Sequence, residues 1–378
     1  MQIPLKRLSG RKGKQAMHIM IFDVPAESGG ALSMLHEVYE EALANEDKTI
    51  KWTFVVSKPD LKETENIKVL RFPWIKRSWI HRLYFDNFVA PKIVKRNKVD
   101  YVLSLQNITV PSVNCGQVLY VHQSLPFVDH KFSFRENKKL WIYQNVIGKK
   151  IIKSIQKADY TIVQAEWMKR ACINKAGIRN EIIEVIPPKV KVEVNKSFKP
   201  TNESLSTFFY PANGMKYKNH KVIVEAASSL KKTTVKKHEI IFTLTGNENE
   251  YISSLYERVK KEKLPIKFCG KMSKKEVFEM YTRSVLIFPS FIETFGLPLL
   301  ESRNHGGIIL ASDTPFAHEI LETYQNSYYF QYEDYRKLSE LMTDILTSKI
   351  LHNNTEKGMN GDGEKVKSLI SFLIKCAE

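Results

Sequence analysis

The sequence has few cysteines and no long hydrophobic run. Its four cysteines lie far apart and form no C-x-x-C pair that could begin a zinc site or a redox centre. No apolar run approaches the roughly 18 residues that span a bilayer. The first 16 residues are basic and lack the apolar stretch of a signal peptide. We therefore expect a basic amino-terminal arm over residues 1–16 and a reducing, cytoplasmic location.

Three motifs of nucleotide enzymes are also missing. The absence of G-x-x-x-x-G-K-[ST] excludes a P-loop NTPase, and no G-x-G-x-x-G follows the first expected strand, which argues against a nicotinamide dehydrogenase. No D-x-D pair offers carboxylates for a metal-bound nucleotide diphosphate. We expect no metal and no cofactor, so cationic side chains and helix dipoles would have to neutralise any diphosphate.

Positive charge is abundant and uneven. The 378 residues include 58 Lys and Arg against 41 Asp and Glu, and residues 1–160 carry +11 of the net +17. Two segments of that half, Arg71–Phe88 and Lys131–Lys153, mix cations with large aromatic side chains. Membranes and nucleic acids both select such mixtures, whereas amphipathic helices with an aromatic inner face would also produce them. The concentration of charge in one half favours contact with an anionic surface.

Short apolar, β-rich runs alternate with helix-length segments along most of the chain. This alternation predicts βαβ units and buried parallel sheets, and hence an α/β protein. The expected strands are Met17–Val24, Lys51–Ser57, Asp100–Leu105, Gln117–His122, Tyr160–Gln164, Thr207–Pro211, Ile240–Thr245, Ile266–Cys269, Val285–Pro289 and Ile308–Ala311.

The rhythm breaks once, near the middle of the chain. Pro187 and Pro188 precede a polar stretch that extends to Ser206, a composition suited to a linker. We therefore expect one domain over residues 17–190 and a second over residues 205–350. A last amphipathic helix is expected within residues 364–378.

The segment Phe288–Ser302 contains the strongest candidate site. A strand ends in a turn that holds Glu293, and Gly296 and Pro298 then favour the start of a new helix. A helix start binds anions such as a diphosphate, and Glu301, expected in the first turn, can accept hydrogen bonds from the diol of a ribose. An ordinary βα unit, in which Glu301 complements the helix dipole, is the alternative.

Three further groups follow expected strands. Lys216 and Lys218 precede a helix expected over Lys221–Leu230, where a lysine can neutralise a departing phosphate, although both could be ordinary exposed lysines. Gly29 and Gly30 precede a helix expected over Leu32–Leu43 and would let a ligand approach the backbone. His122 closes a strand, where its ring could donate to a hydroxyl or a phosphate. A structural role is the alternative for the glycines and the histidine.

Taken together, these segments resemble a retaining glycosyltransferase of family 4, which has the GT-B fold. Glu293 and Glu301 are separated by seven residues, as in the E-x7-E signature of the family, and the resemblance extends from Met17 onward. The family usually has an arginine before its diphosphate lysine, but this sequence has Ala212 and Asn213 there, and Lys216 would take its place. The resemblance implies two Rossmann-like domains that face each other across a cleft, with the last helix crossing back to the first domain.

The resemblance also implies roles for the candidate residues. Glu301 would bind the ribose of a nucleotide-sugar, while Lys218 and Lys216 would contact its diphosphate. Glu293, Lys218 and His122 would be catalytic, with His122 near the sugar or the acceptor. The transferred sugar would also be held by Thr294, Phe295, Gly296 and Leu297. Gly29 and Gly30 would border the diphosphate and the acceptor.

From these implications we expect a metal-independent glycosyltransferase at the inner face of the cell membrane. It would move a sugar, with retention of configuration, from a nucleotide-sugar to a lipid-linked glycan in envelope or capsular polysaccharide synthesis. The basic first half adds an anionic membrane surface as a partner. Another GT-B enzyme, such as a nucleotide-sugar epimerase, is an alternative. A basic nucleic-acid-binding protein is the other, but the sequence has no recognised nucleic-acid motif, so we expect no such partner.

Overall fold

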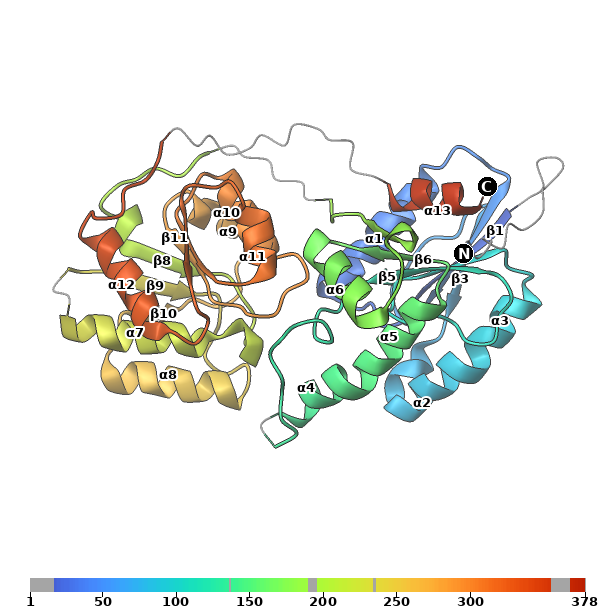
Figure 1. The fold of residues 1–378 in the computed structure, drawn as a ribbon, viewed down its shortest axis with the longest axis horizontal. Coiled ribbons are helices and arrows are strands. Elements are labelled where there is room, and N and C mark those ends of the chain that lie inside the picture. The colour runs from blue at the N-terminus through green and yellow to red at the C-terminus, as the bar shows by residue number, and fades with distance from the viewer. Residues whose placement is uncertain (1–16, 136, 190–195, 234–235, 355–367, 378) are drawn as a thin grey trace. The chain divides into compact units, whose positions relative to one another are not determined.

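The computed structural model describes residues 17–135, 137–189, 196–233, 236–354 and 368–377 (Figure 1). The chain divides into two compact units, one of residues 1–188 together with 365–378, and one of residues 189–364. The expected amino-terminal arm, residues 1–16, lies outside the described residues, as do residues 364–367 of the expected last helix.

The first unit is built on a parallel sheet with the strand order β3-β2-β1-β4-β5-β6-β7. Its strands are β1 (Met17–Asp23), β2 (Ile50–Val56), β3 (Ile67–Arg71), β4 (Tyr101–Ser104), β5 (Gly116–Val121), β6 (Tyr160–Val163) and β7 (Ile183–Val185). Successive side chains of a strand point to opposite faces, and both faces of β1 are buried: Ile19 and Ile21 enter one core, Met20 and Phe22 the other. A sheet covered on both faces explains why these strands are continuous apolar runs.

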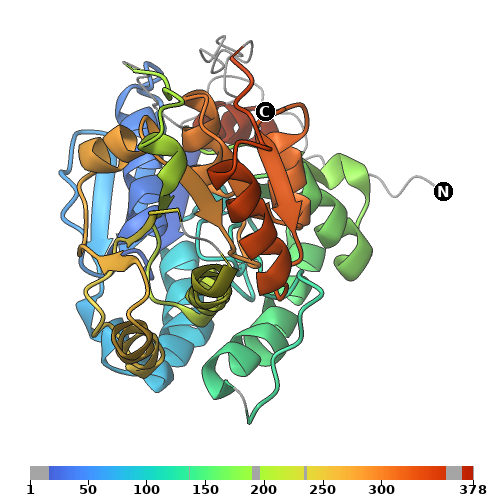
Figure 2. The same cartoon turned by 90° about the vertical axis from the view of Figure 1, so that its left-hand side faces the viewer.

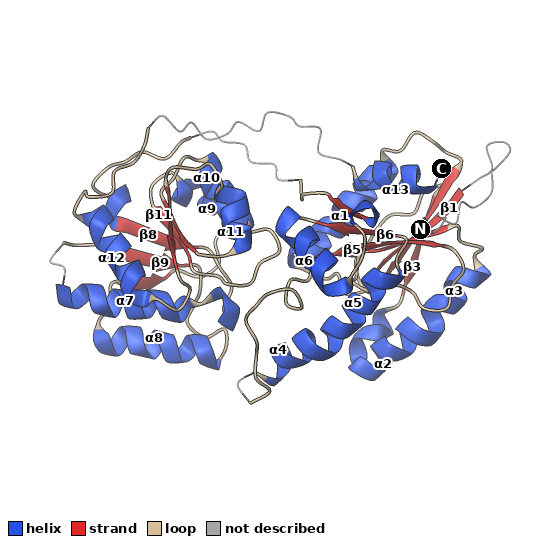
Figure 3. Cartoon of the chain, in the orientation of Figure 1, coloured by secondary structure: helices blue, strands red, loops and turns tan. Residues whose placement is uncertain are grey.

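Helices cover both faces of this sheet, as Figure 3 shows in blue around the red strands. They are α1 (Gly29–Leu43), α2 (Trp79–Tyr84), α3 (Ala90–Arg96), α4 (Lys138–Ile142), α5 (Gly148–Lys157), α6 (Glu166–Ala176) and α13 (Leu369–Ala377), with shorter turns at Pro73–Arg77 and Asn180–Ile182. A π-helical turn joins α2 to α3 at Phe85–Val89, and another joins α4 to α5 at Tyr143–Ile147.

The last helix, α13, packs on the first unit. The Ser368 hydroxyl and the Ile370 backbone N–H both donate to the Glu41 carboxylate, at 2.8 and 3.0 Å. Leu369, Ile370 and Leu373 are buried in the core that α1 also covers. The expectation that the end of the chain returns to the first domain is confirmed.

The second unit repeats this plan with the strand order β10-β9-β8-β11-β12-β13, again parallel. Its strands are β8 (Thr207–Tyr210), β9 (Glu239–Phe242), β10 (Ile266–Phe268), β11 (Val285–Phe288), β12 (Ile309–Ser312) and β13 (Ser327–Phe330). Its helices are α7 (His220–Thr233), α8 (Glu250–Glu262), α9 (Lys274–Tyr281), α10 (Leu297–Asn304), α11 (Pro315–Leu321) and α12 (Tyr335–Leu346), with short turns at Ser204–Ser206 and Lys216–Lys218. Figure 2 shows α7 and α8 nearly end-on.

The strand order of each unit reverses beside its first strand, between β1 and β4 and between β8 and β11. In such sheets, ligands bind outside the carboxyl ends of the strands at this switch point. The loops that follow β8 and β11 therefore mark where the second unit is built to hold a ligand.

All ten expected strands form, and within the described chain three more appear, β3, β7 and β13. Each of the three is the edge strand of its sheet. Their side chains are only partly buried, unlike the fully buried β8 and β11, so their sequences lack a continuous apolar run. In the described parts of the chain, no helix is long and apolar enough to cross a membrane.

Candidate functional site

Two loops at the switch point of the second unit are joined by hydrogen bonds. The backbone N–H of Phe291 and the hydroxyl of Ser290 both donate to the Tyr217 carbonyl, at 3.2 and 3.3 Å. Tyr332, in the loop after β13, contacts both: the Asn219 side-chain amide donates to its carbonyl at 2.6 Å, and its ring stacks on Phe291 at 4.8 Å. The loop after β8 and the loop after β11 thus form one platform.

The turn that holds the two candidate lysines is hydrogen-bonded to the core of the second unit. Lys216–Lys218 form a single 3₁₀ turn, which ends at Asn219 with a φ of 59°, a conformation that asparagine tolerates. The hydroxyl of the fully buried Tyr210 donates to the Lys218 carbonyl at 2.7 Å. The backbone of Lys218 is therefore held by the core, while Lys216 lies in the same turn with an exposed side chain.

Lys218 and Glu293 meet directly. The Lys218 ammonium forms an ion pair with Oε1 of Glu293, and their side chains are only 15% and 17% exposed. Charges this far from water need partners, because an unpaired buried charge costs several kcal/mol, about 3–5 when one partner of a buried pair is removed. The structure thus brings together two residues that the sequence placed in separate motifs.

Helix α10 begins after Gly296, which has a φ of 89°. A Cβ atom there would come within 3.3 Å of Leu299 and 3.4 Å of Phe316, so the position suits glycine in conformation and in space. Because the helix starts at Leu297, Pro298 occupies its second position and not the first, and Glu301 lies in the second turn and not the first as expected. The helix dipole acts within the first turn, which weakens the view that Glu301 only complements it.

Glu301 has a protein partner that sequence reasoning missed. The hydroxyl of Tyr281, at the end of α9 and 1% exposed, donates to Oε2 of Glu301 at 3.1 Å. Burial raises the pKa of Glu301, and the Tyr281 hydrogen bond and the Lys274 charge oppose that rise. No spacing in the sequence links Tyr281 to Glu301, since the contact forms between two different helices.

In the first unit, His122 lies directly after β5 and pairs with Asn107. The Asn107 amide donates to Nε2 of His122 at 3.2 Å, and its carbonyl oxygen accepts from the His122 backbone N–H at 2.8 Å. Burial lowers the pKa of His122 to about 4. The ring is therefore neutral at pH 7 and acts as a hydrogen-bonding group and not as a cation.

The glycine pair lies at the start of α1, which begins at Gly29 and not at Leu32 as expected. Gly29 has a φ of 63°, which favours glycine. A Cβ atom on Gly29 or Gly30 would meet no other atom within 4 Å. The backbone is thus open at this helix start, as a ligand that approaches it would require.

A buried carboxyl group lies beside this loop and was not among the predicted residues. Asp23 ends β1, is 1% exposed, and neither of its carboxyl oxygens finds a hydrogen-bond partner among the described residues. Burial raises the pKa of Asp23 to about 8, against the weaker effects of Arg82, the Ala26 backbone and Lys76. Its position at the end of a strand could have suggested it, but its burial could not be deduced from the sequence.

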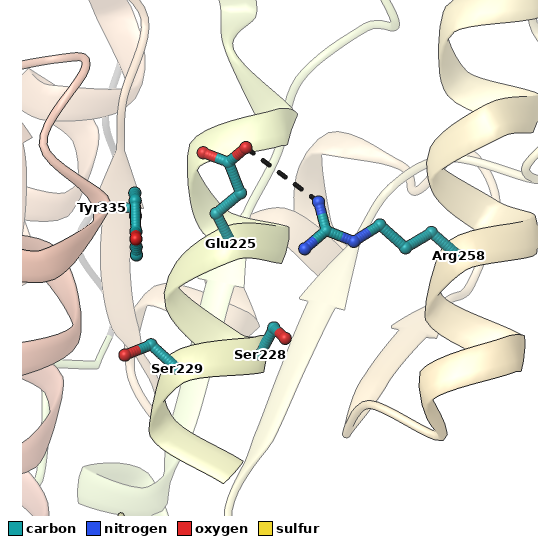
Figure 4. Close-up of a pocket in the computed structure, with 5 residues that line it drawn as sticks. All are labelled: Glu225, Ser228, Ser229, Arg258 and Tyr335. Carbon is teal, nitrogen blue, oxygen red and sulfur yellow. Dashed lines mark ion pairs between the residues drawn. The ribbon is translucent and has the colours of Figure 1, made fainter. Parts of the chain in front are cut away.

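A pocket of about 250 Å³ lies elsewhere on the second unit (Figure 4). It is lined by Glu225, Ser228, Ser229, Arg258 and Tyr335, which come from helices α7, α8 and α12 and not from strand ends. Arg258 is already held by Glu225 at 4.0 Å and by Glu262 at 2.7 Å. Within the described ranges, no three His, Cys, Asp or Glu side chains gather as a metal site.

Residues 192–360 match the sequence model of the glycosyl transferases group 1. The match lies within the second unit, which is therefore similar to this family. The matched range contains the Lys216–Lys218 turn, Glu293 and Glu301, so the group 1 match and the platform coincide. This match agrees with the E-x7-E resemblance of Glu293 and Glu301.

Solved structures show that the fold is GT-B over nearly the whole chain. Sucrose-phosphate synthase from Thermosynechococcus elongatus is 13% identical, with 90% of this chain and 92% of that chain covered and a TM-score of 0.64. HepE from Anabaena, in complex with UDP and glucose, is 15% identical, with 90% of this chain and 91% of that chain covered and a TM-score of 0.62. WaaG, a glycosyltransferase involved in lipopolysaccharide biosynthesis, is 12% identical, with 95% of this chain and 98% of that chain covered and a TM-score of 0.65. No curated protein matches the chain.

Proposed function

We propose that this protein is a group 1 glycosyltransferase, which moves a sugar from a nucleotide-sugar to a glycan acceptor with retention of configuration and without a metal. The observation that carries the proposal is the Lys218–Glu293 pair on the platform at the β8/β11 switch point. It lies within the group 1 match, and the HepE structure of the same fold holds UDP and glucose. For this chain we infer a nucleoside diphosphate sugar as the donor.

In the proposed reaction, the second unit binds the donor. The Lys218 ammonium, assisted by Lys216, neutralises the diphosphate as it leaves, and the positive end of the α10 dipole adds to this effect. The backbone of Thr294 to Leu297 holds the transferred sugar. Glu301 accepts hydrogen bonds from the ribose hydroxyls, and Tyr281 fixes its orientation. Glu293 accepts hydrogen bonds from the transferred sugar.

The first unit supplies the acceptor side. His122, neutral at pH 7, would hydrogen-bond a hydroxyl of the sugar or the acceptor, and the open backbone at Gly29 and Gly30 would border the diphosphate and the acceptor. WaaG acts in lipopolysaccharide biosynthesis, and we infer a lipid-linked glycan of the cell envelope or capsule as the acceptor here.

An exposed apolar surface on the first unit supports a membrane as the place where that acceptor is met. Its members are Trp79, Ile80, Leu83, Tyr84 and Phe88, with exposed fractions of 51–76%. In α2 and the π-helical turn that follows it, Phe85 is buried, whereas Trp79, Tyr84 and Phe88 are exposed. An aromatic inner face therefore does not explain the aromatic residues of Arg71–Phe88. We call this set the α2 surface.

The second basic segment lies next to the α2 surface. The rings of Trp79 and Tyr143 meet at 6.0 Å, and Lys150 pairs with Asp86 at 3.5 Å, so the α4–α5 helix runs beside α2 and α3. Exposed cations surround both helices: Arg77, Lys92, Lys95, Lys138, Lys139 and Lys149. Apolar side chains with a cationic rim favour the interface of an anionic membrane. We propose peripheral binding there, on the cytoplasmic face.

A panel of nucleoside diphosphates and nucleotide-sugars tests the donor site. A ligand that binds the folded state must raise the unfolding temperature, and we expect one nucleotide series to do so in the wild type and not in Glu301→Ala or Lys218→Ala. Glu257→Gln, which breaks an exposed Lys–Glu pair on α8, is the matched control. Wild-type transfer by both site variants would refute the assigned roles.

Product analysis tests the reaction class. A glycosyltransferase forms a new glycoside and releases the nucleoside diphosphate only when an acceptor is present. An epimerase would convert the nucleotide-sugar without an acceptor, and that result would contradict the proposal. Tight, salt-sensitive binding of RNA or DNA would instead favour the nucleic-acid alternative.

A further inference from the structure

The Lys218–Glu293 ion pair joins two residues that the proposed reaction uses for different parts of the donor. Lys218 is assigned to the diphosphate and Glu293 to the transferred sugar, yet in this structure the Glu293 carboxylate lies against the Lys218 ammonium. It thus occupies the position that a diphosphate oxygen would take. A ligand oxygen that takes the N–H now bonded to Glu293 must displace Glu293.

This exchange is confined to the two side chains. Tyr210 holds the Lys218 carbonyl, and the Tyr217 carbonyl accepts hydrogen bonds from Ser290 and Phe291 of the loop that carries Glu293. Because both loops are tied to each other and to the core, displacement of Glu293 requires a change in its side chain and not an opening of the platform.

The displaced carboxylate then needs a new partner. Glu293 is only 17% exposed, so water can replace the lost ammonium only in part. A nucleoside diphosphate takes Lys218 and offers Glu293 nothing, which leaves a poorly solvated charge without its cation. An intact nucleotide-sugar brings hydroxyl groups that can donate to Glu293, so both members of the pair are satisfied.

We propose that the Lys218–Glu293 pair makes the site selective for an intact nucleotide-sugar over the nucleoside diphosphate that remains after transfer. When the sugar leaves, Glu293 loses its hydroxyl donors and returns to Lys218, which weakens the hold on the diphosphate and speeds its release. Glu293 is thus a specificity-determining residue in addition to a sugar ligand. This inference rests on the proposed function, because it assigns the diphosphate to Lys218.

Calorimetric titration of Glu293→Gln tests the inference. The amide keeps the size of the side chain and can still accept from a sugar hydroxyl, but it carries no charge and cannot form an ion pair with the ammonium. The probes are UDP with UDP-glucose, GDP with GDP-mannose, and ADP with ADP-glucose. For the pair that binds the wild type, we expect the nucleoside diphosphate to bind the variant about tenfold more tightly, while the nucleotide-sugar gains much less, so the selectivity falls.

Two controls separate the possible failures. Glu257→Gln removes the same charge from an exposed pair with Lys260 at 3.7 Å and should leave both affinities unchanged. If Lys218→Ala weakens nucleoside diphosphate binding and Glu293→Gln does not strengthen it, the inference is wrong and the donor site stands. If Lys218→Ala has no effect, or no probe binds the wild type, the proposed function fails and the inference with it.

Turnover gives a second readout that a purely structural role would not change. Product inhibition by the nucleoside diphosphate should become stronger in Glu293→Gln, so its inhibition constant falls relative to the KM for the donor. The unfolding temperature of the variant shows whether it is folded, and Glu293→Asp, which keeps the charge, should retain most of the wild-type selectivity. An unchanged ratio of inhibition constant to KM in Glu293→Gln would overturn the inference.

Discussion

The two units share one strand topology but treat the polar groups at their strand ends differently. In the second unit, the charged groups have partners: Lys218 forms an ion pair with Glu293, and Glu301 accepts a hydrogen bond from the Tyr281 hydroxyl. In the first unit, His122 is a neutral ring bonded to Asn107, and Asp23 is a carboxyl group whose pKa burial raises to about 8. A site with prearranged charges suits a diphosphate, whereas neutral donors and acceptors suit sugar hydroxyls. The same fold can therefore hold a charged donor in one half and an uncharged acceptor in the other.

The largest expected effect is on transfer activity, and it compares a variant of the second unit with a variant of the first. Lys218→Ala removes the cation that we propose neutralises the leaving diphosphate, and we expect transfer to fall by about 10²–10³ together with donor affinity. His122→Ala should lower kcat with little change in nucleoside diphosphate affinity, because its ring carries no charge for the phosphate. Steady-state kinetics and calorimetry measure both quantities. Equal losses of nucleoside diphosphate affinity in the two variants would break the division between donor and acceptor sides.

A second effect concerns the pH dependence of stability that Asp23 of the first unit causes. The pKa of Asp23 rises from 3.8 to about 8 on folding, so the folded state holds a proton that the unfolded state releases. The resulting stabilisation is complete below pH 3.8 and is lost as the pH rises towards 8, by about 1.4 kcal/mol per unit of pKa shift. Asp23→Asn should therefore raise the free energy of unfolding at pH 8 and flatten its decline between pH 5 and 8.

Unfolding curves across this pH range measure the effect of Asp23→Asn. Asp60, whose side chain is 97% exposed, provides the control, and Asp60→Asn should keep the wild-type slope. If Asp23→Asn keeps that slope as well, the carboxyl group is ionised in the folded protein. The first unit would then carry a charge at its strand ends, and the contrast with the second unit would be lost.

The sequence was sufficient for the features that depend on local pattern. Interior strands such as β8 and β11 are continuous apolar runs because both faces of the sheet are covered, and Glu293, Gly296 and Glu301 stand out by their spacing. Three edge strands, β3, β7 and β13, were missed because their partly buried side chains form no continuous apolar run, whereas the edge strand β10 was predicted. The starts of α1 and α10 were displaced by a few residues, as helix boundaries depend on backbone hydrogen bonds that spacing does not define.

The partners of the site residues could not be predicted. Tyr281 reaches Glu301 from another helix, and Asn107 reaches His122 from another strand end, so neither contact has a spacing signal. The exposure of Trp79 and Phe88 was also hidden, because composition alone does not define which face of a helix packs against the sheet. These features arise from tertiary packing and not from the order of residues.

A smaller effect tests the hydrogen bond that supports Glu301. Tyr281→Phe removes only a hydroxyl group, and we expect the donor to bind about fivefold more weakly. The hydrogen bond holds the pKa of Glu301 down, so the pKa should rise further in the variant. If the donor binds the Glu301 carboxylate as we propose, its affinity would then be lost at a higher pH as the solution is acidified. Calorimetry from pH 5 to 8 measures the shift, with Tyr256→Phe on α8 as the control; an unchanged pH profile would mean that Tyr281 only packs.

The smallest effect concerns membrane binding by the α2 surface, which we assign to the first unit and not to the second. Leu83 is 51% exposed, and Leu83→Ser should reduce sedimentation with anionic vesicles about threefold, because only part of the side chain is free to enter the lipid interface. Leu351 of the second unit is 71% exposed, yet Leu351→Ser should have no effect, and neither change should alter donor affinity. Binding that is equal with anionic and neutral vesicles would remove the role of the cations. An equal loss in both leucine variants would show that exposed apolar side chains anywhere on the chain suffice, and the contrast between the units would not extend to the membrane.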